Sequence, residues 1–189
     1  MKKEEVVIQL HKPSMNEMLF FLTSGMIMSV PLTLFIYQYA DALLFSLDPF
    51  TVALISGTVF APFIEEFSKA YPLFYRHGET ERSIFNLALL VGIGFGIVEL
   101  VTYVFAFEAP LGSRLPGLFF HPASTSITAY GIATKRPFLF YMIAVALHFS
   151  NNYLILASPF SSASSIFVVA LTVIASFVLH GKTKEKIVV

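Results

Sequence analysis

The apolar stretches of this chain are long enough, and numerous enough, to decide its fold class. A helix that crosses a bilayer needs about 20 mostly apolar residues, and the 189-residue chain divides into six such stretches. Charged residues make up only 13% of the chain, against about 25% in a soluble domain. We therefore predict an all-α, polytopic membrane bundle of about six transmembrane helices. The predicted spans lie near 15–39, 49–75, 83–107, 115–134, 137–157 and 162–180.

The basic residues of the connections predict how this bundle is oriented. Lysine and arginine gather in short loops on the cytoplasmic side of a membrane. Here they occupy alternate connections, whereas the other three connections hold only Arg114. The pattern is satisfied when both termini are cytoplasmic, with residues 1–14 as a cytoplasmic tail and residues 1–189 as one domain. The residues concerned are Lys2, Lys3, Lys12, Arg76, Arg82, Lys135, Arg136, Lys182, Lys184 and Lys186.

Composition and motif content exclude several classes of function. The 12 basic and 12 acidic residues cancel, so net charge gives no reason to expect a nucleic acid partner. Cysteine is absent, which excludes disulfides and thiolate metal sites. Neither a GxSxG nor an HExxH motif occurs. The serines at 161–165 belong to a stretch, 158–165, that we expect to be a loop.

A small set of polar residues falls inside the predicted spans, where lipid disfavours it. Ionisable groups at this depth are costly and usually face a bundle interior or an aqueous cavity. Heights counted at about 1.5 Å per residue place the groups of four helices within a slab about 10 Å thick near mid-membrane. We therefore expect the groups to meet. They are Glu65, Glu66, Lys69, Glu99, His121, His148, Asn151 and Asn152.

Spacing along each helix indicates which of these side chains share a face. Lys69 follows Glu65 by four residues and Glu66 by three, so it can pair with either carboxylate. The adjacent glutamates point about 100° apart and should have different roles. His148 and Asn152 are four residues apart and share a face.

Charge balance adds a constraint on the predicted cluster. If Glu65, Glu66 and Glu99 approach one another, Lys69 alone cannot compensate three carboxylates in a medium of low dielectric. One carboxylate must then hold a proton, a histidine must be charged, or a cation must bind. Gly92 and Gly96 form a small-xxx-small face that should bring Glu99, one turn later, close to a neighbouring helix.

The ordered set of motifs resembles the PrsW family of intramembrane proteases, which belongs with the CAAX prenyl endopeptidases and the bacteriocin-processing proteins. The set begins with Glu65-Glu66-x-x-Lys69 and continues with Gly94-Phe95 leading to Glu99. It ends with His121 and His148-x-x-x-Asn152, so it covers the second to fifth predicted helices. Leu100 departs from the pattern, because PrsW-like sequences commonly have asparagine after this glutamate.

The resemblance implies an intramembrane endopeptidase that hydrolyses a peptide bond of a membrane-anchored protein with activated water. By position, Glu65 would be the general base, and Glu66 and Lys69 would tune and orient it. His148 and Asn152 would match the pair that stabilises the oxyanion in CAAX-type relatives. Glu99 stands where those relatives use histidine, and His121 would supply the imidazole. The expected location is a prokaryotic cell membrane, as a multi-pass protein in the lipid bilayer.

Three other interpretations stay open from the sequence. A zinc-dependent protease would take its ligands from Glu65, Glu99, His121 and His148, although we favour a mechanism without metal or other cofactor. A scaffold without activity would resemble the anterior-pharynx-defective subunit of gamma-secretase. A proton- or cation-coupled transporter would also use carboxylates and histidines in the membrane, but the six spans show no internal repeat of the kind transporters often have.

Overall fold

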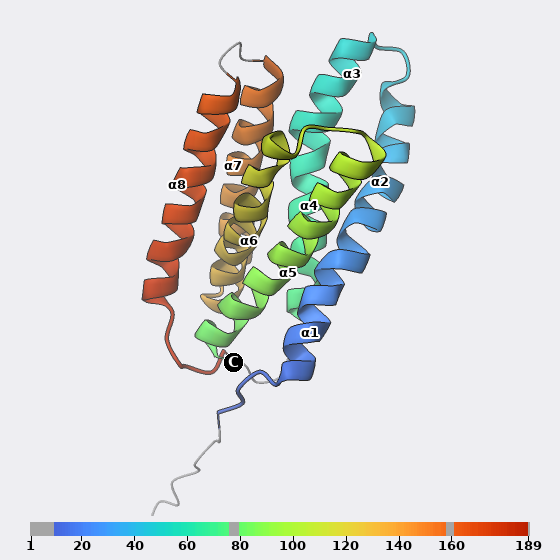
Figure 1. Cartoon of the computed structure of the whole chain (residues 1–189). Helices are drawn as coiled ribbons and strands as arrows, with labels where there is room; N and C mark the ends of the chain where they lie inside the picture. The colour runs from blue at the N-terminus through green and yellow to red at the C-terminus, as the bar shows by residue number, and fades with distance from the viewer. Residues whose placement is uncertain (1–9, 76–79, 158–160, 189) are drawn as a thin grey trace, which may run out of the picture.

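The computed structural model describes residues 10–75, 80–157 and 161–188, and within them the chain forms six long helical segments and no strand (Figure 1). The first three segments contain short π-helical or 3-10 turns within or at the end of an α-helical run. They are α1 (Met15–Ser24), η1 (Gly25–Ser29) and α2 (Val30–Leu44); α3 (Pro49–Ile55), η2 (Ser56–Phe60), α4 (Ala61–Ala70) and η3 (Tyr71–Phe74); and α5 (Glu81–Val101) with η4 (Thr102–Ala106). The last three are α6 (Leu111–Ala133), α7 (Pro137–Ala157) and α8 (Ser161–Lys182).

The all-helical fold is confirmed, and its helices have the character of membrane spans. Within the described residues, four helices are long and apolar enough to cross a bilayer: Pro49–Phe74, Glu81–Ala106, Pro137–Leu156 and Ser164–Lys182. Many large apolar side chains are exposed, more than a soluble protein usually has on its surface. They include Phe105, Phe138 and Phe177, each at least 75% exposed. The total of six spans and the cytoplasmic placement of both termini stay predictions.

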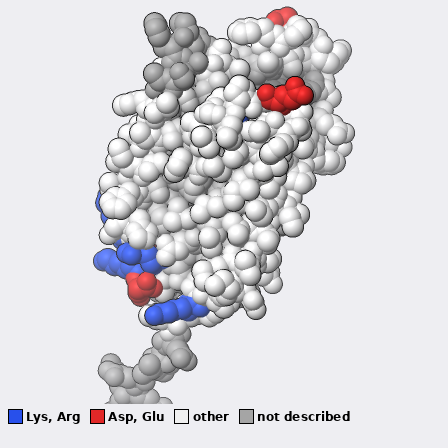
Figure 2. All heavy atoms as spheres, viewed as in Figure 1, with Lys and Arg blue, Asp and Glu red and all other residues white. Residues whose placement is uncertain are grey.

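The two ends of the bundle differ in their charges. The first helix begins and the last helix ends at the same end of the molecule (Figure 1). Most of the lysine and arginine side chains visible in Figure 2 gather at that end. This distribution is the one on which the predicted orientation rests. We refer below to this end of the bundle, where the first helix begins and the last helix ends, as the basic end.

Local sequence explains where several helices begin. Ser14 caps α1 and forms a capping box with Glu17. Asp48 caps α3 by accepting from the backbone N–H groups of Phe50 and Thr51, and hydrogen bonds with Thr51 hold the pKa of its carboxyl below the usual range. Pro49 stands at the first helical position, where no N–H is needed.

The expected loop at 158–165 is wrong for its second half, because Ser161–Ser165 lie in the first turns of α8. Ser158–Phe160 lie outside the described residues. The Ser165 hydroxyl is buried and donates to Asn151 Oδ1 at 2.7 Å. A serine whose hydroxyl is hydrogen-bonded to a neighbouring helix can be part of a helix itself. Local composition could not predict this contact, because the partner lies on α7.

Glycines let α5 pack closely against its neighbours, as the small-xxx-small face predicts. A Cβ atom added at Gly92 would lie 2.3 Å from Pro122 Cα on α6, and one at Gly96 would lie 3.4 Å from the Gly117 carbonyl oxygen. On the other side of α5, a Cβ at Gly94 would meet the Leu22 carbonyl oxygen of α1 at 2.1 Å. The backbone of α5 is therefore held between α1 and α6, and this packing fixes the position of Glu99.

A π-helical turn precedes the glutamate pair on α4. The Ala61 N–H donates to the Ser56 carbonyl five residues back, directly before Pro62, which has no N–H to donate. Thr58 in this turn is buried and donates its hydroxyl to the Leu54 carbonyl at 2.7 Å. The turn lets the helix continue through the proline, and Glu65 and Glu66 follow within one turn.

Candidate active site

A cavity of about 240 Å³ lies in the half of the bundle away from the basic end. It is enclosed by the second helical segment, the end of α5, the first half of α6, the end of α7 and the beginning of α8. Six of the eight polar residues that were expected to meet line it: Glu65, Glu99, His121, His148, Asn151 and Asn152. Polar groups from four helical segments therefore meet at this cavity.

Lys69 and Glu66 form the buried base of the cluster, behind the cavity wall. The Lys69 side chain is fully buried, and its Nζ lies 2.6 Å from Glu66 Oε1. The same ammonium group donates to Ser124 Oγ at 3.3 Å and lies 5.0 Å from the centroid of the Phe95 ring. Neither charged residue lines the cavity. The two charges compensate each other and hold α4 against α6 through Ser124.

His148 contacts both glutamates of α4, through different ring nitrogens. Its Nδ1 lies 2.8 Å from Glu66 Oε1, and its Nε2 lies 3.7 Å from Glu65 Oε2. Glu66 already accepts from Lys69 and is a carboxylate, so His148 Nδ1 must be the donor in this bond. In its neutral form, this histidine then presents the lone pair of Nε2 toward Glu65.

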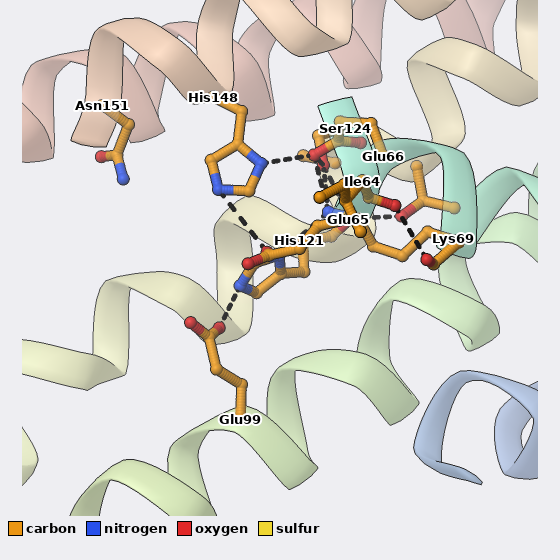
Figure 3. Close-up of polar contacts among 12 residues, drawn as sticks. Ile64, Glu65, Glu66, Lys69, Glu99, His121, Ser124, His148 and Asn151 are labelled. Carbon is orange, nitrogen blue, oxygen red and sulfur yellow. Dashed lines mark hydrogen bonds and ion pairs between the residues drawn. The ribbon is translucent and has the colours of Figure 1, made fainter. Parts of the chain in front are cut away.

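His121 is held in the opposite tautomer by its own two partners. Its Nε2 contacts Glu99 Oε2, and its Nδ1 lies 3.0 Å from Lys69 Nζ. A lysine ammonium can only donate, so Nδ1 accepts the bond, and Nε2 then donates to the Glu99 carboxylate. Figure 3 shows His121 between Glu99 and the α4 cluster. The line from Glu99 to Glu66 thus connects two carboxylates through the neutral imidazole of His121 and the ammonium of Lys69.

Two carboxylate oxygens of the cluster, Glu66 Oε2 and Glu65 Oε2, have no hydrogen-bond partner among the described protein atoms. Glu66 lies behind the cavity wall, so of these two residues only Glu65 lines the cavity. The Glu65 side chain is mostly buried and faces His148 Nε2 (Figure 3). A buried carboxylate oxygen next to an imidazole lone pair is suited to bind and deprotonate a polar ligand such as water.

The two asparagines of α7 complete the wall opposite Glu99. Asn152 Nδ2 donates to the Gly57 carbonyl at 2.9 Å, which leaves its second N–H free for the cavity. Asn151 also lines the cavity; its Nδ2 donates to Asn152 Oδ1 at 3.2 Å, and its Oδ1 accepts from Ser165. Asn151 therefore orients the amide of Asn152.

Sequence reasoning missed three contributors to the site. Ser124 donates to Glu66 Oε1 at 3.2 Å and lies one turn after His121, a spacing that could have drawn attention to it. Arg114 and Tyr103 line the cavity near its surface, and the Arg114 guanidinium lies 3.6 Å from the centroid of the Tyr103 ring. The sequence places Arg114 only in a connection between predicted spans. No local pattern linked it to Tyr103 on another helix.

The described side chains at the cavity are of types that bind a divalent metal. They contact one another two at a time, however, and do not form a set of three ligands around one point. Carboxylate and imidazole are ordinary zinc ligands, and Glu65 Oε2 and His148 Nε2 both have free lone pairs. His121 Nε2, however, is already engaged with Glu99. Within the described residues, no three or more His, Cys, Asp or Glu side chains gather in a way that could hold a metal ion. A metal would fit the chemistry of Glu65 and His148, with further ligands supplied by rearrangement.

Comparison with known proteins gives a single family. The sequence model of the PrsW family, described as intramembrane metalloproteases, matches residues 13–179. This range contains every residue of the cavity and all but the last turn of α8. No curated protein and no solved structure matches the chain significantly.

Proposed function

Since the chain belongs to the PrsW family, it is an intramembrane protease, and we propose that it hydrolyses a peptide bond of a membrane-anchored protein with water activated by Glu65. The observation that carries the proposal is the free, buried Oε2 of Glu65 in the cavity, 3.7 Å from His148 Nε2. Glu66 and Glu99 are less suited to this role. Glu66 does not line the cavity, and its Oε1 is engaged by Lys69, Ser124 and His148. Glu99 is bonded to His121.

In the proposed reaction, Glu65 takes a proton from water while the water oxygen attacks the carbonyl carbon of the substrate peptide bond. The free N–H of Asn152 donates to the oxyanion that forms. The proton passes from Glu65 to His148 Nε2, and the resulting imidazolium is stabilised by Glu66. This imidazolium protonates the leaving nitrogen as the C–N bond breaks, which leaves a carboxyl group on one product and an amine on the other.

The remaining polar residues act as positioning residues in this proposal. Glu66 fixes the His148 tautomer, and Lys69 compensates Glu66 and anchors His121. His121 in turn holds the Glu99 carboxylate at the cavity wall. Of the two carboxylates that line the cavity, Glu65 is thereby free to exchange a proton while Glu99 is engaged by His121.

The second candidate is a zinc-dependent mechanism, which the description of the family favours. Glu65 and His148 would then be ligands, joined by Glu99 or His121, and the metal would supply a more acidic bound water. This candidate concerns the same cavity and the same substrates. It differs from the first in the role of His148, which would hold the metal instead of a proton.

The test compares wild-type protein with Glu65→Gln and Glu65→Asp in liposomes, using a labelled transmembrane peptide library as substrate. We expect Glu65→Gln to lower kcat by roughly 10²- to 10⁴-fold, because the amide cannot accept the proton, while the fold is kept. Glu81→Gln, an exchange at the basic end of the bundle, is the matched control and should cleave normally. Wild-type cleavage by Glu65→Gln would overturn the proposal.

Metal content separates the two candidates in the same samples. Elemental analysis after gentle purification should give less than one zinc per chain if the water is activated by Glu65 alone. Stoichiometric zinc in the wild type that is lost in His148→Ala would establish the zinc-dependent mechanism instead.

A further inference from the structure

Arg114 stands apart from the other charged residues of the cavity because its charge meets an aromatic ring and no carboxylate among the described residues. It lines the cavity, and its Nε is buried without a hydrogen-bond partner. Among the described residues its side chain makes no ion pair and no hydrogen bond. The one contact assigned to it is the stacking of the guanidinium on the Tyr103 ring at 3.6 Å. A guanidinium with five donors and no acceptor is prepared for an external ligand.

Arg114 also brings a positive charge to a cavity whose other charged residues are glutamates and histidines. Of the residues known to line it, Arg114 is the only lysine or arginine, since Lys69 lies behind the wall. The stack on Tyr103 holds the guanidinium plane in place, which lowers the entropy lost when a ligand binds. Carboxylates are matched best, because a guanidinium can donate two parallel hydrogen bonds to them.

The position of Arg114 relates it to the proposed reaction centre. Arg114, Gly117 and His121 follow one another at spacings of three and four along α6, so they share one face of the helix. The seven residues from Arg114 to His121 correspond to roughly 10 Å along the helix axis. An extended peptide covers that distance in about three residues.

Gly117 keeps the path between these two points open. A Cβ atom at this position would lie 3.6 Å from Glu99 Oε2 and 3.6 Å from His121 Nε2, so any larger side chain would fill the space over this pair. Gly117 itself lines the cavity. A substrate backbone could therefore pass along this face of α6, from the reaction centre toward Arg114.

We propose that Arg114 is a specificity residue that binds a carboxylate of the polypeptide substrate two to four residues from the cleaved bond, on the side away from the basic end. The proposal rests on the proposed proteolytic function. It explains the two features that the reaction itself leaves unused: the free guanidinium and the open glycine face that leads to it. A phosphate of a lipid headgroup is a weaker match, since Arg114 lines the internal cavity and its Nε is buried.

Binding is tested with synthetic transmembrane peptides in which Asp, Asn or Lys is placed in turn at each position of the segment beyond the apolar core. One set of peptides carries an amidated C-terminus, and a second set with the same sequences carries a free one. Binding is measured on Glu65→Gln protein with Arg114 intact and on the double variant Glu65→Gln/Arg114→Gln. Arg136→Gln, at an exposed site of the α6–α7 connection, is the matched control.

With Arg114 intact, we expect the best Asp peptide to bind about 10- to 100-fold more tightly than its Asn counterpart, as for a charge-assisted hydrogen bond in a buried setting. Arg114→Gln should reduce the ratio to about twofold or less, and Arg136→Gln should leave it unchanged. Arg114→Lys should recover only part of it, because lysine lacks the planar fork. If Arg114 instead favours the free C-terminus over the amidated one, whichever side chain is present, the main-chain carboxylate is the source.

Several results would overturn the inference. One is a preference for Asp that persists in Arg114→Gln, and another is no preference in either protein. A third is Arg114-dependent binding of anionic vesicles without any effect on peptides, which would assign the residue to lipid.

Peptide cleavage by the single variants Arg114→Gln and Glu65→Gln, each compared with wild type, tests this inference and the proposed function separately. Cleavage that depends on Glu65 but ignores Arg114 would remove the inference alone. Peptide binding that depends on Arg114 without any cleavage that depends on Glu65 would remove the proposed function.

Discussion

Two polar networks lie in different parts of the bundle, and they use their hydrogen-bonding groups differently. The tail clasp, at the basic end, joins residues 183–187 to the residues that begin α5. Glu81 N donates to the Lys186 carbonyl at 3.0 Å, and Arg82 N donates to the Lys184 carbonyl at 3.1 Å. The Arg82 side chain donates to Thr183 through Nε and a terminal nitrogen.

The cavity network engages most of its groups but leaves selected atoms free. Glu65 Oε2 and Arg114 Nε are both buried without a partner among the described residues, and both belong to side chains that line the cavity. Unmet polar atoms inside a protein cost free energy, so their occurrence together in one cavity indicates a ligand site. The clasp, in contrast, has the character of a structural connection.

The largest effect is expected from removal of the cation at the base of the cavity. Lys69→Met leaves Glu66 buried without its ion pair, which should lower the free energy of unfolding by about 3–5 kcal/mol. Arg82→Met, in the half-exposed clasp, should cost only about 1 kcal/mol. Unfolding in mixed micelles would measure both. The double variant Lys69→Met/Glu66→Gln should recover part of the lost stability. Equal losses of stability in Lys69→Met and Arg82→Met would contradict the difference between the two networks.

An intermediate effect is expected where α5 and α6 touch. Gly92→Ala places a Cβ atom 2.3 Å from Pro122 Cα and should destabilise the protein by about 1–3 kcal/mol, because backbone must move. The shift should also displace Glu99 and reduce peptide cleavage. Gly112→Ala is the matched control, since no atom lies within 4 Å of the added Cβ. A Gly92→Ala protein with normal stability and cleavage would contradict this account of the helix packing.

The smallest effect is expected at the clasp. Thr80 caps α5 by accepting from Ser83 N at 3.1 Å, and its hydroxyl donates to Glu185 Oε2 at 2.9 Å. Thr80→Ala should cost about 1 kcal/mol of stability and leave kcat/KM for peptide cleavage unchanged. Thr80→Ser, which keeps the hydroxyl, should restore the stability. A loss of cleavage in folded Thr80→Ala protein would connect the clasp with the cavity.

Much of the fold could be predicted because lipid imposes a simple length rule. The observed helical segments begin and end within about five residues of the predicted spans, since an apolar run of about 20 residues has few alternatives in a bilayer. The prediction failed at Ser161–Ser165 because a serine-rich segment is ambiguous until its partners are known. Asn151 on α7, which accepts from Ser165, resolves that ambiguity.

The site was predictable as a set of residues but not as a set of roles. Depth and helical spacing were enough to bring Glu65, Glu99, His121 and His148 together, because each must avoid lipid and all lie at one level. Spacing also allowed Lys69 to pair with either glutamate of α4. The choice of Glu66 depends on Ser124 and His148, which come from two other helices.

The sequence by itself therefore determined the helical membrane fold, the common level of the polar residues along the helices and the close approach of α5 to α6. These properties follow from composition and from the fixed rise and turn of a helix. Only the tertiary structure decided which carboxylate stays free, which nitrogen of each histidine faces the cavity, and that Arg114 joins it. Those outcomes depend on distances between helices, which side-chain packing sets and which spacing along one helix cannot encode.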